Sequence, residues 1–62
     1  MLKVLIADDS QVIRMRVARI INEVDGAELI GEASNGQETI DFLQQVNPDV
    51  LILDFRMPDI NG

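Results

Sequence analysis

The sequence contains neither cysteine nor histidine. Without cysteine, the chain has no disulfide framework and no thiolate ligands for a metal. Without histidine, it has no imidazole base, so the usual nucleophilic triads are excluded as well. Any chemistry that this chain performs is therefore expected to use carboxylates.

Positive charge and long apolar runs are also scarce. Five basic residues against 11 acidic ones give a net charge of −6, which argues against non-specific attraction to nucleic acid or to an anionic membrane. The apolar run near the N-terminus, residues 4–7, is far too short for a signal peptide or a membrane span. These features predict a cytoplasmic protein segment that contacts neither nucleic acid nor membrane.

The composition is typical of a small globular piece. The 62 residues are 47% hydrophobic and 26% charged, and no repeat, linker or low-complexity segment divides them. We therefore expect one domain unit over residues 1–62. A unit of this size is only marginally stable by itself.

The apolar periodicity alternates between strand and helix. A buried strand is predicted at the apolar run of residues 4–7, a weaker strand at residues 29–33, and a third strand at the apolar residues 50–53. Between them, apolar residues recur at helical spacing, first up to Asp25-Gly26 and then up to Asn47-Pro48. We expect Met15 to fill the core beneath the first helix, and the second helix to place three apolar side chains on its inner face: Ile40, Leu43 and Val46.

A β-α-β-α-β order with continuous apolar strands predicts an α/β fold with a parallel sheet covered on both faces. With strand order 2-1-3, right-handed crossovers put the two helices on opposite faces of a doubly wound sheet. Ligands bind such sheets at the carboxyl ends of the strands, where the chain direction reverses. Asp8 and Asp9 follow the first strand and Asp54 ends the third, so three carboxylates should meet there.

Three neighbouring carboxylates repel one another unless a cation joins them. Mg²⁺ prefers oxygen ligands and keeps several waters, which suits such a cluster. A carboxylate can also attack phosphorus and form an aspartyl phosphate. Asp54 is thus a candidate nucleophile beside a candidate Mg²⁺ site.

The motifs "LIADDS", "GEASNGQETI" and "LILDFRMPDING" occur in this order and spacing, and with them the chain resembles the receiver domain of two-component response regulators. The resemblance implies a flavodoxin-like fold of which residues 1–62 form the N-terminal half. It implies a phosphoacceptor rather than an enzyme, although the parent protein could catalyse its own phosphorylation and dephosphorylation. It also assigns the following roles: Asp54 as phosphoacceptor, Asp9 as direct Mg²⁺ ligand, Asp8 as ligand through water, the Arg56 main-chain carbonyl as a further ligand, and Met57, Pro58 and Gly62 as loop-shaping residues.

The partner implied by the resemblance is a sensor histidine kinase. The family's later hydroxyl and lysine have no counterpart here, so the isolated fragment is expected to be inactive or impaired. The alternative is a non-catalytic fragment that acts by self-association, as a homodimer, or by pairing with a complementary half through its third strand. A hydrolase using aspartyl phosphate chemistry is disfavoured, because Arg56 stands where such enzymes usually carry a second acid.

Five other polar positions have simpler interpretations. Ser10 is predicted to cap the first helix. Asp49 lies about 16 Å from Asp54 along the strand, at about 3.3 Å per residue, so it is expected to open the strand rather than join the site. The helical arginines are expected to form a solvated face: Arg14, Arg16 and Arg19.

Overall fold

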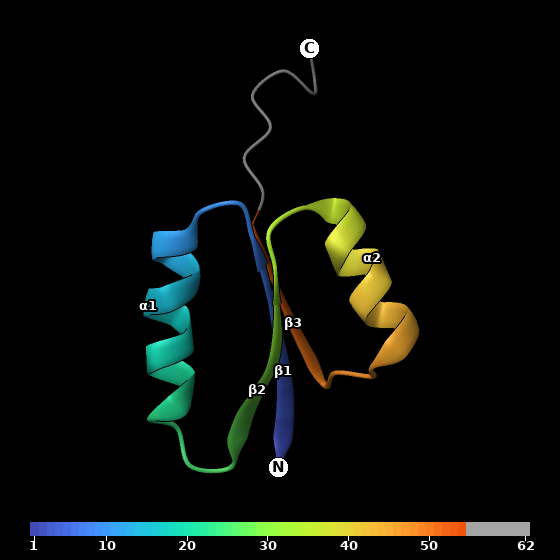
Figure 1. Cartoon of the computed structure of the whole chain (residues 1–62). Coiled ribbons are helices and arrows are strands. Elements are labelled where there is room, and N and C mark those ends of the chain that lie inside the picture. Colours follow the sequence, from blue (N-terminus) through green and yellow to red (C-terminus); the bar gives the residue numbers. More distant parts are fainter. Residues whose placement is uncertain (55–62) are drawn as a thin grey trace.

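The computed structural model describes residues 1–54, which form three strands and two helices (Figure 1). In chain order these are β1 (Leu2–Asp8), α1 (Gln11–Asn22), β2 (Ala27–Ala33), α2 (Gly36–Gln45) and β3 (Val50–Asp54). The predicted β-α-β-α-β order is confirmed. Both β1 and β2 begin two residues before the apolar runs that predicted them, because polar or exposed residues also pair in the sheet.

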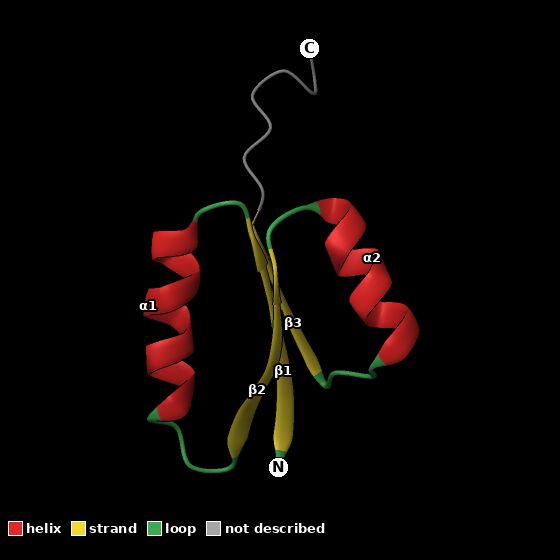
Figure 2. Cartoon of the chain, viewed as in Figure 1, coloured by secondary structure: helices red, strands yellow, loops and turns green. Residues whose placement is uncertain are grey.

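The sheet has the predicted order β2-β1-β3, and both of its strand pairs are parallel. Figure 2 shows α1 and α2 on opposite sides of the strands, as right-handed crossovers to either side of a central β1 require. The α/β, doubly wound architecture expected from the sequence is therefore confirmed for the described residues. No helix within residues 1–54 has the length and apolar character needed to cross a membrane.

Polar residues fix where the helices begin. The Ser10 side chain accepts a hydrogen bond from the Ile13 N–H at 3.3 Å, which confirms it as the N-cap of α1. Asn35 caps α2 in the same way, accepting from the Glu38 N–H at 2.8 Å. After α1, the chain reverses at Gly26, whose φ of 87° lies in the left-handed region that favours glycine.

The core is built around β1. Val4 to Ala7 are all at most 4% exposed, because this strand has a neighbour on each edge and a helix near each face. Val4 and Ile6 pack with Ile21 beneath α1. Alternation along the strand directs Leu5 to the other face, toward α2.

A glycine in β2 lets α2 approach the sheet closely. The pairing of β1 with β2 shifts by one residue, so that Val4 lies opposite Leu29 and Leu5 opposite Gly31. A Cβ added at Gly31 would lie 2.7 Å from Cε1 of Phe42 and 3.2 Å from Cδ1 of Leu5. The Phe42 ring therefore rests where a side chain at Gly31 would otherwise stand.

Three predicted core positions are wrong. Met15 on α1 is 55% exposed, while Ile40 and Leu43 on α2 are 51% and 45% exposed. On α2, which packs on β2 through Thr39 and Phe42, Ile40 lies on the outer side of the helix and Leu43 lies at the flank of the packed face. On α1, Met15 lies about 100° away from the side that packs beneath the helix.

β1 pairs with a strand on each of its edges. Its register with β3 determines which residues lie next to each other at the carboxyl end of the sheet. The Lys3 N–H donates to Oδ2 of Asp49 and the Asp49 N–H donates to the Lys3 carbonyl, both at 2.8 Å. From this double contact the ladder runs without a shift to Asp8 opposite Asp54. Asp49 thus opens the strand, as predicted, and it also fixes the register that aligns the two acids five residues further on.

Replacing Gly31 by Ala should destabilise the chain by about 1–3 kcal/mol, because the new methyl group must displace the Phe42 ring against Leu5. Urea unfolding followed by circular dichroism measures the change. Gly36→Ala is the control, since a Cβ there meets nothing within 4 Å and alanine favours the helix. Equal stability of the wild-type and Gly31→Ala chains would refute the close approach.

Candidate functional site

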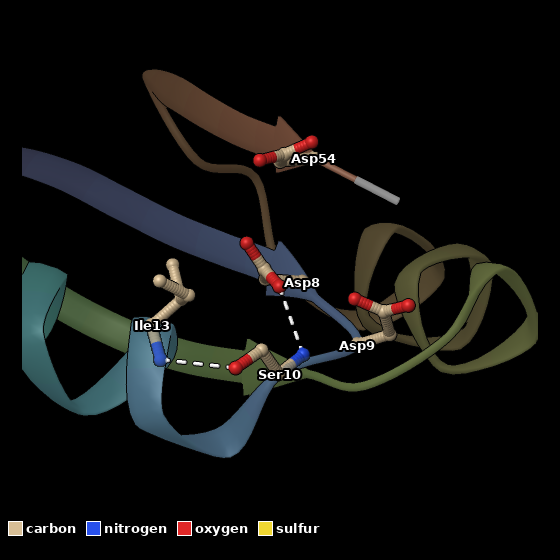
Figure 3. Close-up of a pocket in the computed structure, with 5 residues that line it drawn as sticks. All are labelled: Asp8, Asp9, Ser10, Ile13 and Asp54. Carbon is tan, nitrogen blue, oxygen red and sulfur yellow. Dashed lines mark hydrogen bonds between the residues drawn. The ribbon is translucent and has the colours of Figure 1, made fainter. Parts of the chain in front are cut away.

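A pocket of about 240 Å³ opens at the carboxyl ends of β1 and β3 (Figure 3). Five residues line it: Asp8, Asp9, Ser10, Ile13 and Asp54. All three carboxylates predicted to meet at the switch point therefore border one pocket. Parallel strands end at the same edge of a sheet, which is why residues 45 positions apart in the chain come together.

Asp8 is the buried member of the group, with 5% of its surface exposed. Its Oδ1 accepts a hydrogen bond from the Ser10 N–H at 2.8 Å, which closes a tight turn between the strand and α1. In Figure 3 only one of the two oxygens carries this bond, and the other extends to the side on which β3 lies. Asp8 can therefore stabilise the turn and still present an oxygen to the pocket.

Asp54 and Asp9 are both exposed. Because Asp54 is the register partner of Asp8 on a neighbouring parallel strand, their side chains leave the same face of the sheet. In Figure 3 Asp9 lies just beyond the end of β1, and it borders the same pocket as Asp8 and Asp54. A molecule from solution can reach Asp54 without any opening of the described structure.

The oxygen donors suit a hard divalent cation, but they form no complete cage. Within residues 1–54, no three acidic side chains converge closely enough to hold a metal ion among themselves. A cation that keeps several of its waters needs only one or two carboxylates, so Mg²⁺ fits the chemistry of this donor set. The predicted Arg56 carbonyl ligand and the loop residues Met57, Pro58 and Gly62 lie outside the described residues.

Arg14 is a neighbour of the site, and its predicted place on a solvated face is wrong. Its side chain is only 15% exposed. One guanidinium nitrogen, Nη1, donates to the Asp8 carbonyl at 2.6 Å, and Nε lies 3.3 Å from Oε1 of Glu32. The sequence did carry a signal, because Arg14 shares the helical spacing i, i+3, i+4, i+7 with the inner-face residues Val17, Ala18 and Ile21.

The start of α2 contains the carboxyl group with the clearest perturbation. Hydrogen bonds from the backbone and side chain of Ser34, at 2.7 and 2.8 Å, lower the pKa of Glu38 below its usual 4.5, with a smaller contribution from the positive charge of Arg14. Together with the Asn35 cap, these bonds form a variant of the capping box. They fix the loop that follows β2 at the same edge of the sheet as the pocket.

Residues 4–62 match the family described as response regulator receiver domain. The chain is 36% identical over 62 residues to the response regulator GacA of Pseudomonas syringae, covering all of this chain and 29% of that protein. It is 45% identical over 62 residues to an uncharacterized response regulatory protein of Yersinia pestis, covering 26% of it. It is also 45% identical over 60 residues to protein-glutamate methylesterase/protein-glutamine glutaminase 1 of Saccharophagus degradans, covering 97% of this chain and 16% of that protein.

The chain thus spans less than a third of the length of each of these relatives. The methylesterase resemblance concerns the matched 16% of that protein. What the chain shares with all three is the segment that carries the acidic pair and Asp54.

Replacing Glu38 by Gln should remove a pH-dependent part of the stability. A carboxyl group whose pKa is lower in the folded chain stabilises the fold above the unfolded pKa, and this contribution disappears as the pH falls through the folded pKa. The wild type should therefore be more stable than Glu38→Gln above pH 4.5, and the difference should vanish well below it. Urea unfolding of both chains across this range is the measurement, and a difference independent of pH would contradict the assignment.

Proposed function

Since the chain belongs to the response regulator receiver domain family, we propose that it supplies the nucleophile and the metal ligands of a phosphoacceptor site. Asp54 receives the phosphoryl group from a histidine of a sensor kinase. In this transfer a bond forms between phosphorus and a carboxylate oxygen of Asp54, while the bond from phosphorus to the imidazole nitrogen breaks. The imidazole of the kinase is the leaving group, so no further reactant is needed.

The observation that carries the proposal is the register of Asp54 opposite Asp8 at the rim of the pocket. One acid is buried and held by the turn, while the other is exposed at the end of an edge strand. This division suits a site in which a fixed carboxylate serves binding and an accessible one serves attack. An in-line approach to phosphorus requires an accessible nucleophile, and exposure of Asp54 permits it.

Bound Mg²⁺ would neutralise charge on the transferring phosphoryl group. We assign Asp9 as its direct ligand, Asp8 as a ligand through water, and the Arg56 main-chain carbonyl as a further ligand. Asp8 has an oxygen on the β3 side for this role, because its other oxygen is held by Ser10. Asp54 would be the remaining ligand, so that its carboxylate would contact the cation as well as attack phosphorus.

The chain is an acceptor rather than an enzyme in this proposal, and it acts in the cytoplasm, where it meets the kinase. We expect residues 1–62 alone to be phosphorylated poorly, because no hydroxyl or lysine of a later strand helps to hold the phosphoryl oxygens. The net charge of −6 makes direct contact of this segment with nucleic acid unfavourable.

The direct test is a chimeric chain in which residues 1–62 are joined to the part of GacA that follows the matched stretch. Incubated with Mg²⁺ and a small acyl phosphate, the chimera should gain one phosphoryl group, detected by intact-mass spectrometry. Asp54→Asn should abolish the gain, because the amide is not a nucleophile for phosphorus, whereas Asp25→Asn in the loop before β2 should leave it unchanged.

Two further outcomes complete this test. Asp9→Ala in the chimera should abolish the Mg²⁺-dependent phosphorylation while keeping the helical circular dichroism spectrum. Phosphorylation that survives Asp54→Asn, or a chimera that is folded but never modified, would overturn the proposed function.

The exposure of β3 favours a second candidate, self-association of this chain. Its apolar residues are all between 37% and 57% exposed: Val50, Leu51, Ile52 and Leu53. Among the described strands, β3 pairs only with β1, and it contains neither proline nor lysine to discourage further pairing. A second copy related by a two-fold axis would cover the same patch on both chains.

In this second candidate, Leu51→Lys should shift the chain from dimer to monomer, because a charge would then lie in the shared strand edge. Sedimentation equilibrium over a concentration series measures this shift. Val12→Lys on α1 introduces the same charge at an exposed apolar site outside β3 and should leave the dimer intact. A well-folded wild-type monomer at micromolar concentration would eliminate self-association, and a dimer that survives Leu51→Lys would remove β3 from it.

A further inference from the structure

The Arg14 side chain joins three elements at the edge of the sheet that bears the acids. It starts on α1, donates from Nη1 to the carbonyl of Asp8 at the end of β1, and pairs through Nε with Glu32 of β2. The distances are 2.6 Å and 3.3 Å. We call this arrangement of Arg14, Glu32 and the Asp8 carbonyl the arginine clasp.

The fold explains why both partners reach the guanidinium. Arg14 continues the inner face of α1 toward the helix start, one turn before Val17 and Ala18. Glu32 lies in register with Ile6, whose side chain packs beneath α1, so Glu32 leaves the same face of the sheet. An arginine side chain that is only 15% exposed needs such partners, and its planar guanidinium can engage a carboxylate and a carbonyl at once.

The clasp acts on the peptide group between Asp8 and Asp9. The carbonyl that Arg14 holds belongs to this peptide, so its orientation decides how the two acidic side chains leave the backbone. On the other side of the turn, the Ser10 N–H holds the Asp8 carboxylate at 2.8 Å. One hydrogen bond therefore holds the Asp8–Asp9 peptide directly, and the other closes the turn around it.

Glu32 has a second effect, because it occupies Nε of the guanidinium. An arginine beside three carboxylates could bind them and compete with a cation. Its pairing with Glu32 instead directs Nη1 to a neutral carbonyl. The carboxylates of Asp8 and Asp54 are left to the pocket.

From this geometry we propose that Arg14 is a positioning residue of the phosphoacceptor site: held by Glu32, it fixes the Asp8–Asp9 peptide so that the acids face Asp54 in cation-binding orientation. The inference rests on the proposed function and adds to it a residue that contacts neither the cation nor the phosphoryl group. A purely structural role, the attachment of α1 to β2, is the competing explanation. The two explanations differ in what they predict for cation binding.

Amide hydrogen exchange and Mg²⁺ titration, both followed by NMR on the 62-residue chain, test the proposal. In Arg14→Gln and in Glu32→Gln, the Ser10 amide should exchange about tenfold faster, since loss of a hydrogen bond from a charged donor frees the turn. The amides of Leu5 and Ile6 report whether the core remains folded. Arg16→Gln is the matched control, because it removes the same charge from an exposed position on the same helix.

The Mg²⁺ titration distinguishes a positioning role of Arg14 from the effect of its positive charge on cation binding. Removing a positive charge should by itself strengthen cation binding, and Arg16→Gln measures this effect. Arg14→Gln should instead weaken binding several-fold at Asp8 and Asp54, because the ligands lose their orientation. Glu32→Gln removes a negative charge, so Glu28→Gln on the same strand is its matched control.

Either of two results overturns the clasp: unchanged exchange at Ser10 in both variants, or Arg14→Gln binding Mg²⁺ as tightly as Arg16→Gln. If Arg14→Gln does not fold, the proposal is tested with Glu32→Gln instead. Its Ser10 amide exchange and its Mg²⁺ binding are then compared with those of Glu28→Gln. If the wild type shows no Mg²⁺ response at Asp8 or Asp54, the proposed function fails. In that event the Ser10 exchange still decides whether Arg14 holds the turn.

Discussion

The unshifted pairing of β1 with β3 is the constraint on which the site depends. It starts at the double hydrogen bond between Lys3 and Asp49 and ends with Asp8 opposite Asp54. A slip of one residue would turn the Asp54 side chain to the other face of the sheet and leave Asp8 without its neighbour. The chemistry proposed at one end of the sheet thus depends on a pair of hydrogen bonds at the other end.

Stability and accessibility are divided between the two strands that carry the acids. β1 is central and buried, so Asp8 is held by the best-packed part of the chain. β3 is an edge strand with exposed side chains, which leaves Asp54 open to a partner. The arginine clasp adds local order at the end of β1, where the buried strand gives way to the turn. A reactive carboxylate can be reached in this arrangement while its neighbour stays fixed.

Much of this could be predicted from the sequence. Apolar periodicity was sufficient to predict the element order, because β1 and β3 carry continuous apolar runs and each helix is amphipathic. Periodicity could not tell which apolar stripe of a helix packs, and so Met15, Ile40 and Leu43 were wrongly placed in the core. Arg14 was misassigned because its partners come from other elements, and the one-residue shift beside Gly31 is likewise a tertiary effect. The metal and phosphoryl roles of the acids stay predictions.

The proposed cation site is tested most directly by a titration of the 15N-labelled chain with Mn²⁺, whose unpaired electrons broaden the NMR signals of nearby nuclei. The amides of Asp8, Asp9 and Asp54 should broaden first and together. Asp49, at the opposite end of the same strand, and Asp25, in the loop before β2, should broaden only at much higher metal concentration. Simultaneous broadening of all five, or broadening of Asp8 without Asp54, would contradict a cation site built by the register of β1 and β3.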